Sequence, residues 1–308
     1  MTLSCLLYTF ACVSIAFVTC CAIVFSFGTA ERNADVKGRA IVILVSNSSI
    51  GRMFARNLDK AGFGVAAAQW SAQEERTVTQ EYATRPKENV TKTQRNASHH
   101  FSSTGFWGLV NNAGISTFGE TGWLPMETYE KFADVNLLGS IRTTLAFLPL
   151  LRKYKGRIVF MSSIIAYFTL GNGIYSMTKA AIEKFCDALR LEMKKFGVQV
   201  CIIQPGNYAR STKIQPPLSA EEIWSELSEE EKAVYSKEYV QERADFFNSI
   251  LSEGSTNGNE VVDAMVDALT SPAPKARYMV AKLKEKALVL VCPAVVLLPG
   301  SGEAVYHM

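Results

Sequence analysis

Histidine and regularly spaced cysteine are both scarce in this chain. Three of its 308 residues are histidine (His99, His100 and His307). The seven cysteines follow no metal-ligand spacing, and four of them fall within the first 21 residues. This pattern argues against a structural zinc site and against a disulfide scaffold, and no metal is expected at the functional site.

A strong charge of one sign is also missing. Lys and Arg together number 32 against 29 Asp and Glu, which gives a net charge of +3 without a long basic run. That charge is too small for a phosphate-binding surface, so nucleic acid is not an expected partner. Hydrophobic residues make up 48% of the chain and charged residues 20%, a balance that excludes a disordered chain.

The N-terminal segment has no charge over residues 3–27, and Arg32, Lys37 and Arg39 follow it. Such a run exceeds the roughly 30 Å hydrocarbon core of a bilayer when it is helical. We expect residues 1–30 to be a transmembrane anchor, with a cleaved signal peptide as the alternative. The expected location is the endoplasmic reticulum membrane first and a mitochondrial membrane second.

The residues after this segment predict an α/β fold. Residues 39–45 form a continuous apolar run, the pattern of a strand buried on both faces, and a helical pattern at 51–60 and a weaker strand at 64–68 follow. Further strands are expected at 107–110, 156–161 and 198–203. This order predicts one domain with a doubly wound, Rossmann-like parallel sheet over residues 31–282 and an apolar C-terminal tail at 283–308.

Between the strands, residues 126–151 predict one long helix with Phe132, Val135, Leu138 and Leu145 on its inward face. Residues 212–258 are charged and helical, as in a lid over a substrate. Residues 260–269 predict one more helix. Residues 71–103 are polar and lack apolar periodicity, although a complete sheet requires regular elements there.

The chemistry is carried by a phenol and an ammonium four residues apart, Tyr175 and Lys179, one turn apart on a predicted helix. A neighbouring ammonium favours phenolate, so Lys179 is expected to lower the pKa of Tyr175 toward the working range of a general acid or base. Ser163 lies twelve residues upstream at the carboxyl end of a predicted strand, where its hydroxyl can hydrogen-bond a developing alkoxide. Asn136, an amide in the middle of a helix, is expected to link to Lys179 through water.

These motifs resemble the short-chain dehydrogenase/reductase family over residues 38–278. Asn-Asn-Ala-Gly at 111–114, Tyr-x3-Lys at 175–179 and Pro-Gly at 205–206 carry the resemblance in this order. Within the family, residues 111–120 and 205–208 are similar to the D-β-hydroxybutyrate dehydrogenases. The Ser163–Tyr175 spacing and the uncharged N-terminus are more similar to the retinol and 17β-hydroxysteroid dehydrogenases.

The resemblance implies a catalytic set of Tyr175, Lys179, Ser163 and Asn136, and NAD or NADP as cofactor. Tyr175 would be the acid/base and Lys179 would hold the nicotinamide ribose. The remaining cofactor-binding residues implied are Ser46, Asn47, Ser49, Gly51, Asn111, Ala113, Gly114, Pro205, Gly206 and Thr212.

The phosphate loop departs from the family pattern, because only Gly51 remains of its glycines. Glycines in such a loop let backbone N–H groups approach a pyrophosphate. Ser46, Asn47 and Ser49 still offer hydroxyl and amide donors. The second strand ends in Gln69-Trp70, without a carboxylate or an arginine, so the sequence does not distinguish NAD from NADP.

Three hypotheses follow. The first is a membrane-anchored oxidoreductase that transfers hydride between the cofactor and a secondary alcohol or ketone, with a small lipophilic or hydroxy-acid substrate and a homo-oligomeric state. The second is a non-catalytic binding protein that keeps the dehydrogenase fold with a degraded cofactor loop. The third is an aberrant chain whose segment at 71–103 and tail do not fold well.

Overall fold

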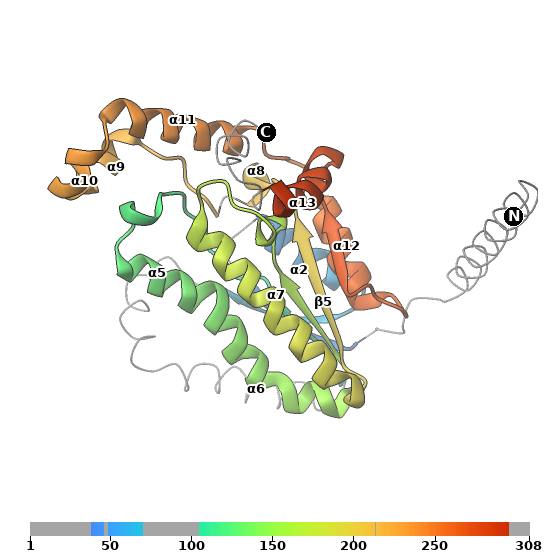
Figure 1. Cartoon of the computed structure of the whole chain (residues 1–308). Coiled ribbons are helices and arrows are strands. Elements are labelled where there is room, and N and C mark those ends of the chain that lie inside the picture. The colour runs from blue at the N-terminus through green and yellow to red at the C-terminus, as the bar shows by residue number, and fades with distance from the viewer. Residues whose placement is uncertain (1–37, 46–48, 70–104, 213, 296–308) are drawn as a thin grey trace, which may run out of the picture. The chain divides into compact units, whose positions relative to one another are not determined.

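The structure is a computed structural model that describes residues 38–45, 49–69, 105–212 and 214–295 (Figure 1). The described residues up to Leu269 and from Pro274 onward form one compact unit. The predicted anchor at 1–30 and the polar segment at 71–103 lie outside the described residues. Among the helices that are described, none has both the length and the apolar character needed to cross a bilayer.

The unit is built on six parallel strands in the order β2-β1-β3-β4-β5-β6. The order reverses at β1, which pairs with both β2 and β3, so the sheet is doubly wound and Rossmann-like as predicted. The strands are β1 (Ala40–Val45), β2 (Gly64–Gln69), β3 (Phe106–Asn111), β4 (Arg157–Met161), β5 (Gln199–Pro205) and β6 (Arg277–Val280).

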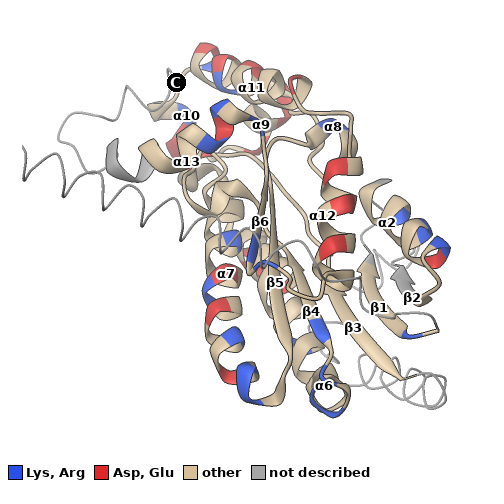
Figure 2. Ribbon diagram, turned by 90° about the vertical axis from the view of Figure 1, so that its right-hand side faces the viewer, with Lys and Arg blue, Asp and Glu red and all other residues tan. Residues whose placement is uncertain are grey.

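Helices cover both faces of the sheet. Helices α6 and α7 lie on one face and α2 and α12 on the other (Figures 1 and 2). The α-helices of the described chain are α2 (Ser49–Lys60), α5 (Met126–Phe132), α6 (Gly139–Tyr154), α7 (Gly173–Met193), α8 (Ala209–Thr212), α9 (Ala220–Glu226), α10 (Glu229–Val234), α11 (Lys237–Ser252), α12 (Asn259–Thr270) and α13 (Leu283–Val295).

The segment predicted to be a helical lid is helical, and serines start three of its helices. Ser219, Ser228 and Ser236 accept hydrogen bonds from backbone N–H groups in the first turns of α9, α10 and α11. In α10 the Glu231 carboxylate also accepts a hydrogen bond from the backbone N–H of Ser228, which completes a capping box. These local signals explain why so charged a stretch forms helices.

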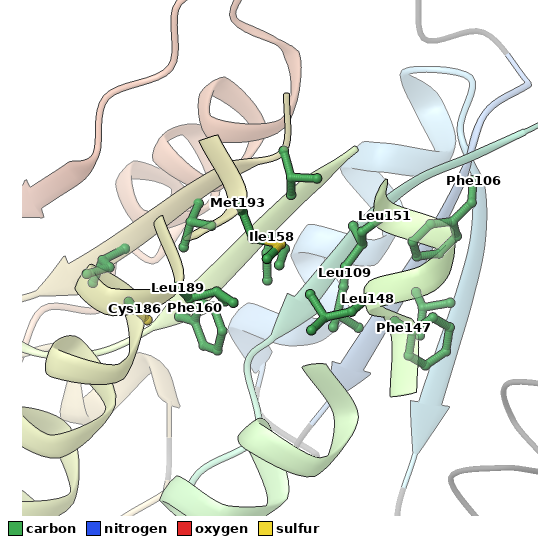
Figure 3. Close-up of a cluster of buried hydrophobic side chains, with 14 of the residues drawn as sticks. Phe106, Leu109, Phe147, Leu148, Leu151, Ile158, Phe160, Cys186, Leu189 and Met193 are labelled. Carbon is green, nitrogen blue, oxygen red and sulfur yellow. The ribbon is translucent and has the colours of Figure 1, made fainter. Parts of the chain in front are cut away.

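Alternating strand residues meet α6 and α7 in the main core (Figure 3). Phe160 from β4 and Val200 from β5 pack there with Ile182 from α7. In β3 a bulge at Trp107 interrupts the alternation, because Ala40 pairs with Phe106 and Ile41 with Gly108. The extra residue lets both Phe106 and Leu109 face α6.

The long helix predicted at 126–151 is divided, and its predicted inward face is partly wrong. A π-helical turn, Ala133–Leu138, separates α5 from α6. A π turn holds more residues than an α turn and so rotates the following face. Phe132 is buried as predicted, whereas Leu138 and Leu145 are 41% and 58% exposed. The core positions of α6 are instead Phe147, Leu148 and Leu151.

Replacing Phe147 with alanine tests this assignment of the α6 face. Phe147 is 1% exposed and stacks on Phe106 with 5.5 Å between ring centroids. We expect Phe147→Ala to lower the free energy of unfolding by about 3–5 kcal/mol, measured by urea denaturation. Leu145→Ala, on the exposed side of the same helix, should change it by no more than about 0.5 kcal/mol. Equal losses of unfolding free energy in the two variants would contradict this assignment and support the inward face predicted from the sequence.

Candidate active site

Helix α7 presents Tyr175 and Lys179 one turn apart, and both side chains are buried. The Nζ of Lys179 lies 5.5 Å from the centre of the Tyr175 ring. It donates a hydrogen bond of 2.9 Å to the carbonyl oxygen of Met161, the last residue of β4. This bond therefore ties α7, the helix that contains Tyr175, to the carboxyl end of β4.

Ser163 follows β4 and caps the short 3-10 turn Ile164–Ala166. Its Oγ accepts a bond from the backbone N–H of Ile165 and donates to the carbonyl oxygen of Pro205, each at 3.3 Å. The hydroxyl also forms a hydrogen bond with the Tyr175 phenol. Ser163, Tyr175 and Lys179 thus lie together, as the twelve-residue spacing predicted.

Burial dominates the protonation of the two titrating groups. Burial raises the pKa of Tyr175 above its ordinary value of 10.0, and the hydrogen bond with Ser163 lowers it only in part. Burial also lowers the pKa of Lys179 to about 8, against a smaller opposing effect of the nearby Glu183 carboxylate. The expectation that the pKa of Tyr175 is lowered toward the working range is wrong for this structure, because loss of hydration raises this pKa.

Asn136 lies in the π-helical turn and is 2% exposed. Its Oδ1 accepts a bond from the backbone N–H of Ile115, and its Nδ2 donates to the carbonyl oxygen of Ile115 and to Oγ1 of Thr178. Both Nδ2 hydrogens are therefore used within the protein. The side chain fixes the segment after Gly114 against α7, and the expected link from Asn136 to Lys179 through water stays a prediction.

A cavity of about 270 Å³ opens beside these groups. Six residues that the resemblance implies for catalysis or for the nicotinamide end of a cofactor are brought together in its wall, namely Ser163, Tyr175, Lys179, Pro205, Gly206 and Thr212. Gly114, implied for the adenosine side, also lines it. Asn112 also lines it, with a buried Nδ2 that has no partner. An unpaired buried donor is costly unless a ligand accepts from it, so these residues fit a nicotinamide and its ribose.

Other implied cofactor residues lie elsewhere. Asn111 and Ala113 are not part of the cavity wall, and Nδ2 of Asn111 donates instead to Thr144 of α6 at 3.1 Å. Ser46 and Asn47 lie outside the described residues. Ser49 and Gly51 are in the first turn of α2, and Ile50 between them lines the cavity.

Glu285 reaches the site from α13 and was not predicted from the sequence. Its Oε1 accepts from the backbone N–H of Asn207 at 2.8 Å, and its Oε2 accepts from that of Lys282 at 2.7 Å. A Cβ at Gly206 would collide with this carboxylate. A single carboxylate at the start of an otherwise apolar run was the available signal.

A doubly wound sheet with a buried tyrosine and lysine and a half-buried serine at the carboxyl ends of its strands is the arrangement of a nicotinamide-dependent oxidoreductase. Comparison with known proteins agrees, since the family model described as short chain dehydrogenase matches residues 39–223. The chain belongs to the short-chain dehydrogenase family. It is therefore a nicotinamide-dependent dehydrogenase, and its cofactor is NAD or NADP.

Curated relatives share about a third of their residues with the chain. It is 36% identical to the mitochondrial D-beta-hydroxybutyrate dehydrogenase of Rattus norvegicus over 261 residues, which cover 78% of this chain and 76% of that protein. It is 35% identical to retinol dehydrogenase 7 of Mus musculus over 256 residues, which cover 80% and 81%. The family resemblance is confirmed, and the non-catalytic alternative receives no support.

Solved structures share the fold at lower identity. A short-chain dehydrogenase from Streptomyces avermitilis has a TM-score of 0.65 and 19% identity, covering 84% of this chain and 94% of its own. A short chain dehydrogenase from Burkholderia cenocepacia in complex with NADP has a TM-score of 0.58 and 18% identity, covering 84% and 96%.

The buried ammonium predicts a pH dependence of stability. Because the pKa of Lys179 is about 8 in the folded protein and 10.5 ordinarily, the unfolded chain binds more protons between these values. Lys179 should therefore contribute a rise in the free energy of unfolding with pH across this window, by up to about 3 kcal/mol. The buried thiols of Cys186 and Cys201, whose pKa values burial raises, act in the opposite direction above pH 9, so the contribution of Lys179 is read as the difference from Lys179→Met. In Lys179→Met this contribution should vanish, as measured by urea denaturation at several pH values.

Lys184→Met is the matched control, since Lys184 is exposed on the same helix. It should keep the pH-dependent slope of the unsubstituted protein. A slope that persists unchanged in Lys179→Met would mean that other groups produce it.

Proposed function

We propose that the chain is a membrane-anchored oxidoreductase that interconverts a secondary alcohol and a ketone of a lipophilic substrate. The observation that carries this proposal is that the Ser163 and Tyr175 side chains line the wall of one cavity beside the Lys179 ammonium, with Ser163 acting on the Tyr175 phenol. Two hydroxyls that reach the same point can hold one substrate oxygen between them.

The proposed roles follow from these positions. A bound nicotinamide ring accepts or supplies the hydride. The Oη of Tyr175 takes the proton of the substrate hydroxyl in oxidation and returns it to the carbonyl oxygen in reduction. Ser163 donates to the same oxygen as charge develops on it, Lys179 offsets the negative charge on the phenolate, and Asn136 holds the cavity wall against α7.

The protonation of Tyr175 suits proton donation to a substrate. Its raised pKa keeps the phenol protonated near neutral pH. A protonated phenol can donate to a carbonyl oxygen, which is the proton transfer that ketone reduction requires.

The character of the cavity wall supports a lipophilic substrate of retinoid or steroid type. Beyond the reacting groups the wall is largely apolar, with Phe118, Ile164, Ile165, Phe168, Leu170, Ile214, Ile250, Leu251 and Leu288. A hydroxy acid is the second candidate, because Lys282 and Lys284 also line the cavity and could pair with a carboxylate.

Tyr175→Phe should abolish turnover while cofactor binding persists. Loss of the acid/base hydroxyl should lower kcat by at least about 1000-fold, since proton transfer contributes on that order. Turnover would be measured by NADH and NADPH absorbance on a panel of retinoid, steroid and 3-hydroxy-acid substrates. Binding would be measured by titration of cofactor fluorescence.

Tyr154→Phe is the control, because Tyr154 packs at the far end of α6 and does not line the cavity. It should retain full turnover. If neither cofactor supports turnover of any substrate in the panel, the proposed reaction is rejected, and if neither binds, the fit of the cavity to nicotinamide is rejected as well.

Membrane attachment is proposed for residues 1–30 and the catalytic domain for 31–282, with the apolar tail at 283–308 contributing α13 to the cavity of that domain. The uncharged run at 3–27 and the basic residues after it support the anchor, and we favour the endoplasmic reticulum over mitochondria. The full chain should resist alkaline carbonate extraction from membranes, and a chain without residues 1–30 should be soluble. Extraction of the full chain by carbonate would contradict the anchor.

Sedimentation of the soluble form without residues 1–30 should give a homo-oligomer. Imaging of the tagged full chain should identify the organelle.

A further inference from the structure

A third titratable group lies on the same face of α7 as the catalytic pair. Glu183 is one turn beyond Lys179 and is 5% exposed. Its Oε1 accepts a bond of 2.7 Å from Oγ of Ser162, and both of its carboxylate oxygens accept from Nε2 of Gln204 at 2.9 Å. A buried carboxylate is retained only where bonds and charge compensate its lost hydration.

The hydrogen-bond partners of Glu183 directly precede two site residues in the sequence. Ser162 precedes Ser163 at the end of β4, and Gln204 precedes Pro205 at the end of β5. The backbone N–H of Ser162 also donates to Ile203 at 2.8 Å, which pairs the two strand ends. One carboxylate therefore joins the helix of Tyr175 and Lys179 to both strand ends that form the opposite wall.

The charge of Glu183 also acts on Lys179. Both groups are buried, so little water screens them, and the carboxylate raises the pKa of the ammonium against the effect of burial. Arg277 of β6 faces Glu183, with Nε 3.5 Å from Oε2, and its guanidinium also pairs with Asp187 of α7. The other titratable groups around Glu183 are Arg190, which pairs with Asp187, the thiol of Cys186, and Tyr167, whose hydroxyl accepts from Gln204.

We propose that Glu183 is a positioning residue of the dehydrogenase site. It holds the strand ends that carry Ser163 and Pro205 against α7 and supplies the buried negative charge that stabilises the ammonium of Lys179. The link to turnover rests on the proposed function, whereas the effect on Lys179 is a property of the folded chain alone.

The charge is tested without cofactor or substrate. In Glu183→Gln the packing shape is kept and the charge is lost, so Lys179 should release its proton at lower pH. The rise that Lys179 contributes to the unfolding free energy, taken as the difference from Lys179→Met, should then begin about one pH unit lower than in the unsubstituted protein. Glu192→Gln, at an exposed position of the same helix, should leave the onset unchanged. In a Lys179→Met background, Glu183→Gln should produce no shift.

Arg277→Gln provides a test of opposite sign that structural damage cannot imitate. Removing this cation should let Lys179 keep its proton longer, so the rise should begin at higher pH. It also keeps the proposal testable if Glu183→Gln does not fold. An unmoved onset in Glu183→Gln, the same shift with Lys179 absent, or a downward shift in Arg277→Gln would each overturn the proposal.

Turnover separates the two contributions of Glu183. Ser162→Ala removes one positioning bond and keeps the charge, so it should lower kcat for ketone reduction without moving the alkaline limb of the pH profile. Glu183→Gln should lower kcat and also move that limb to lower pH. If the unsubstituted protein reduces no ketone, the proposed function fails, and the unfolding experiment still decides the action of Glu183 on Lys179.

Discussion

The buried ammonium of Lys179 is the constraint on which the arrangement of the site depends. An ammonium removed from water must be bonded, and its bond to the carbonyl oxygen of Met161 ties α7 to the end of β4. That bond places Tyr175, one turn earlier on α7, against Ser163, two residues beyond Met161. The position of the reacting hydroxyls is thus a consequence of where a buried charge finds its acceptor.

The opposite wall of the cavity depends on a second carboxylate, that of Glu285. It bonds the backbone of Asn207 and occupies the space beside Gly206, so α13 closes the cavity near Pro205 and Gly206. A side chain at position 206 would displace this carboxylate from its place. A segment late in the sequence therefore completes a site whose reacting groups come from β4 and α7, and it brings both Leu288 and two lysines to the cavity wall.

Local patterns were sufficient to predict the parts of the fold that are local in origin. The sequence predicted β1, β4 and β5 from their apolar runs, and it predicted that Tyr175 and Lys179 share a helix face from their spacing. Neither prediction needed tertiary information, because both patterns involve residues that are close in the sequence. The exposed faces of Leu138 and Leu145 were not predictable, since a π-helical turn leaves no clear mark in hydropathy. The pKa of Tyr175 and the contacts of Glu285 were missed because burial and contact between distant segments decide both.

The degenerate glycine loop and the well-formed reacting groups are compatible, because different elements hold them. The bonds that position Ser163, Tyr175 and Lys179 involve β4, β5 and α7, and none of these bonds involves β1 or α2. The absence of glycines after β1 therefore affects the binding of a pyrophosphate and leaves the geometry of Ser163, Tyr175 and Lys179 unaffected. We therefore expect the chain to keep the chemistry of its family, and we predict that its affinity for the dinucleotide depends on hydroxyl and amide donors such as Ser46 and Asn47 in place of a closely approaching backbone.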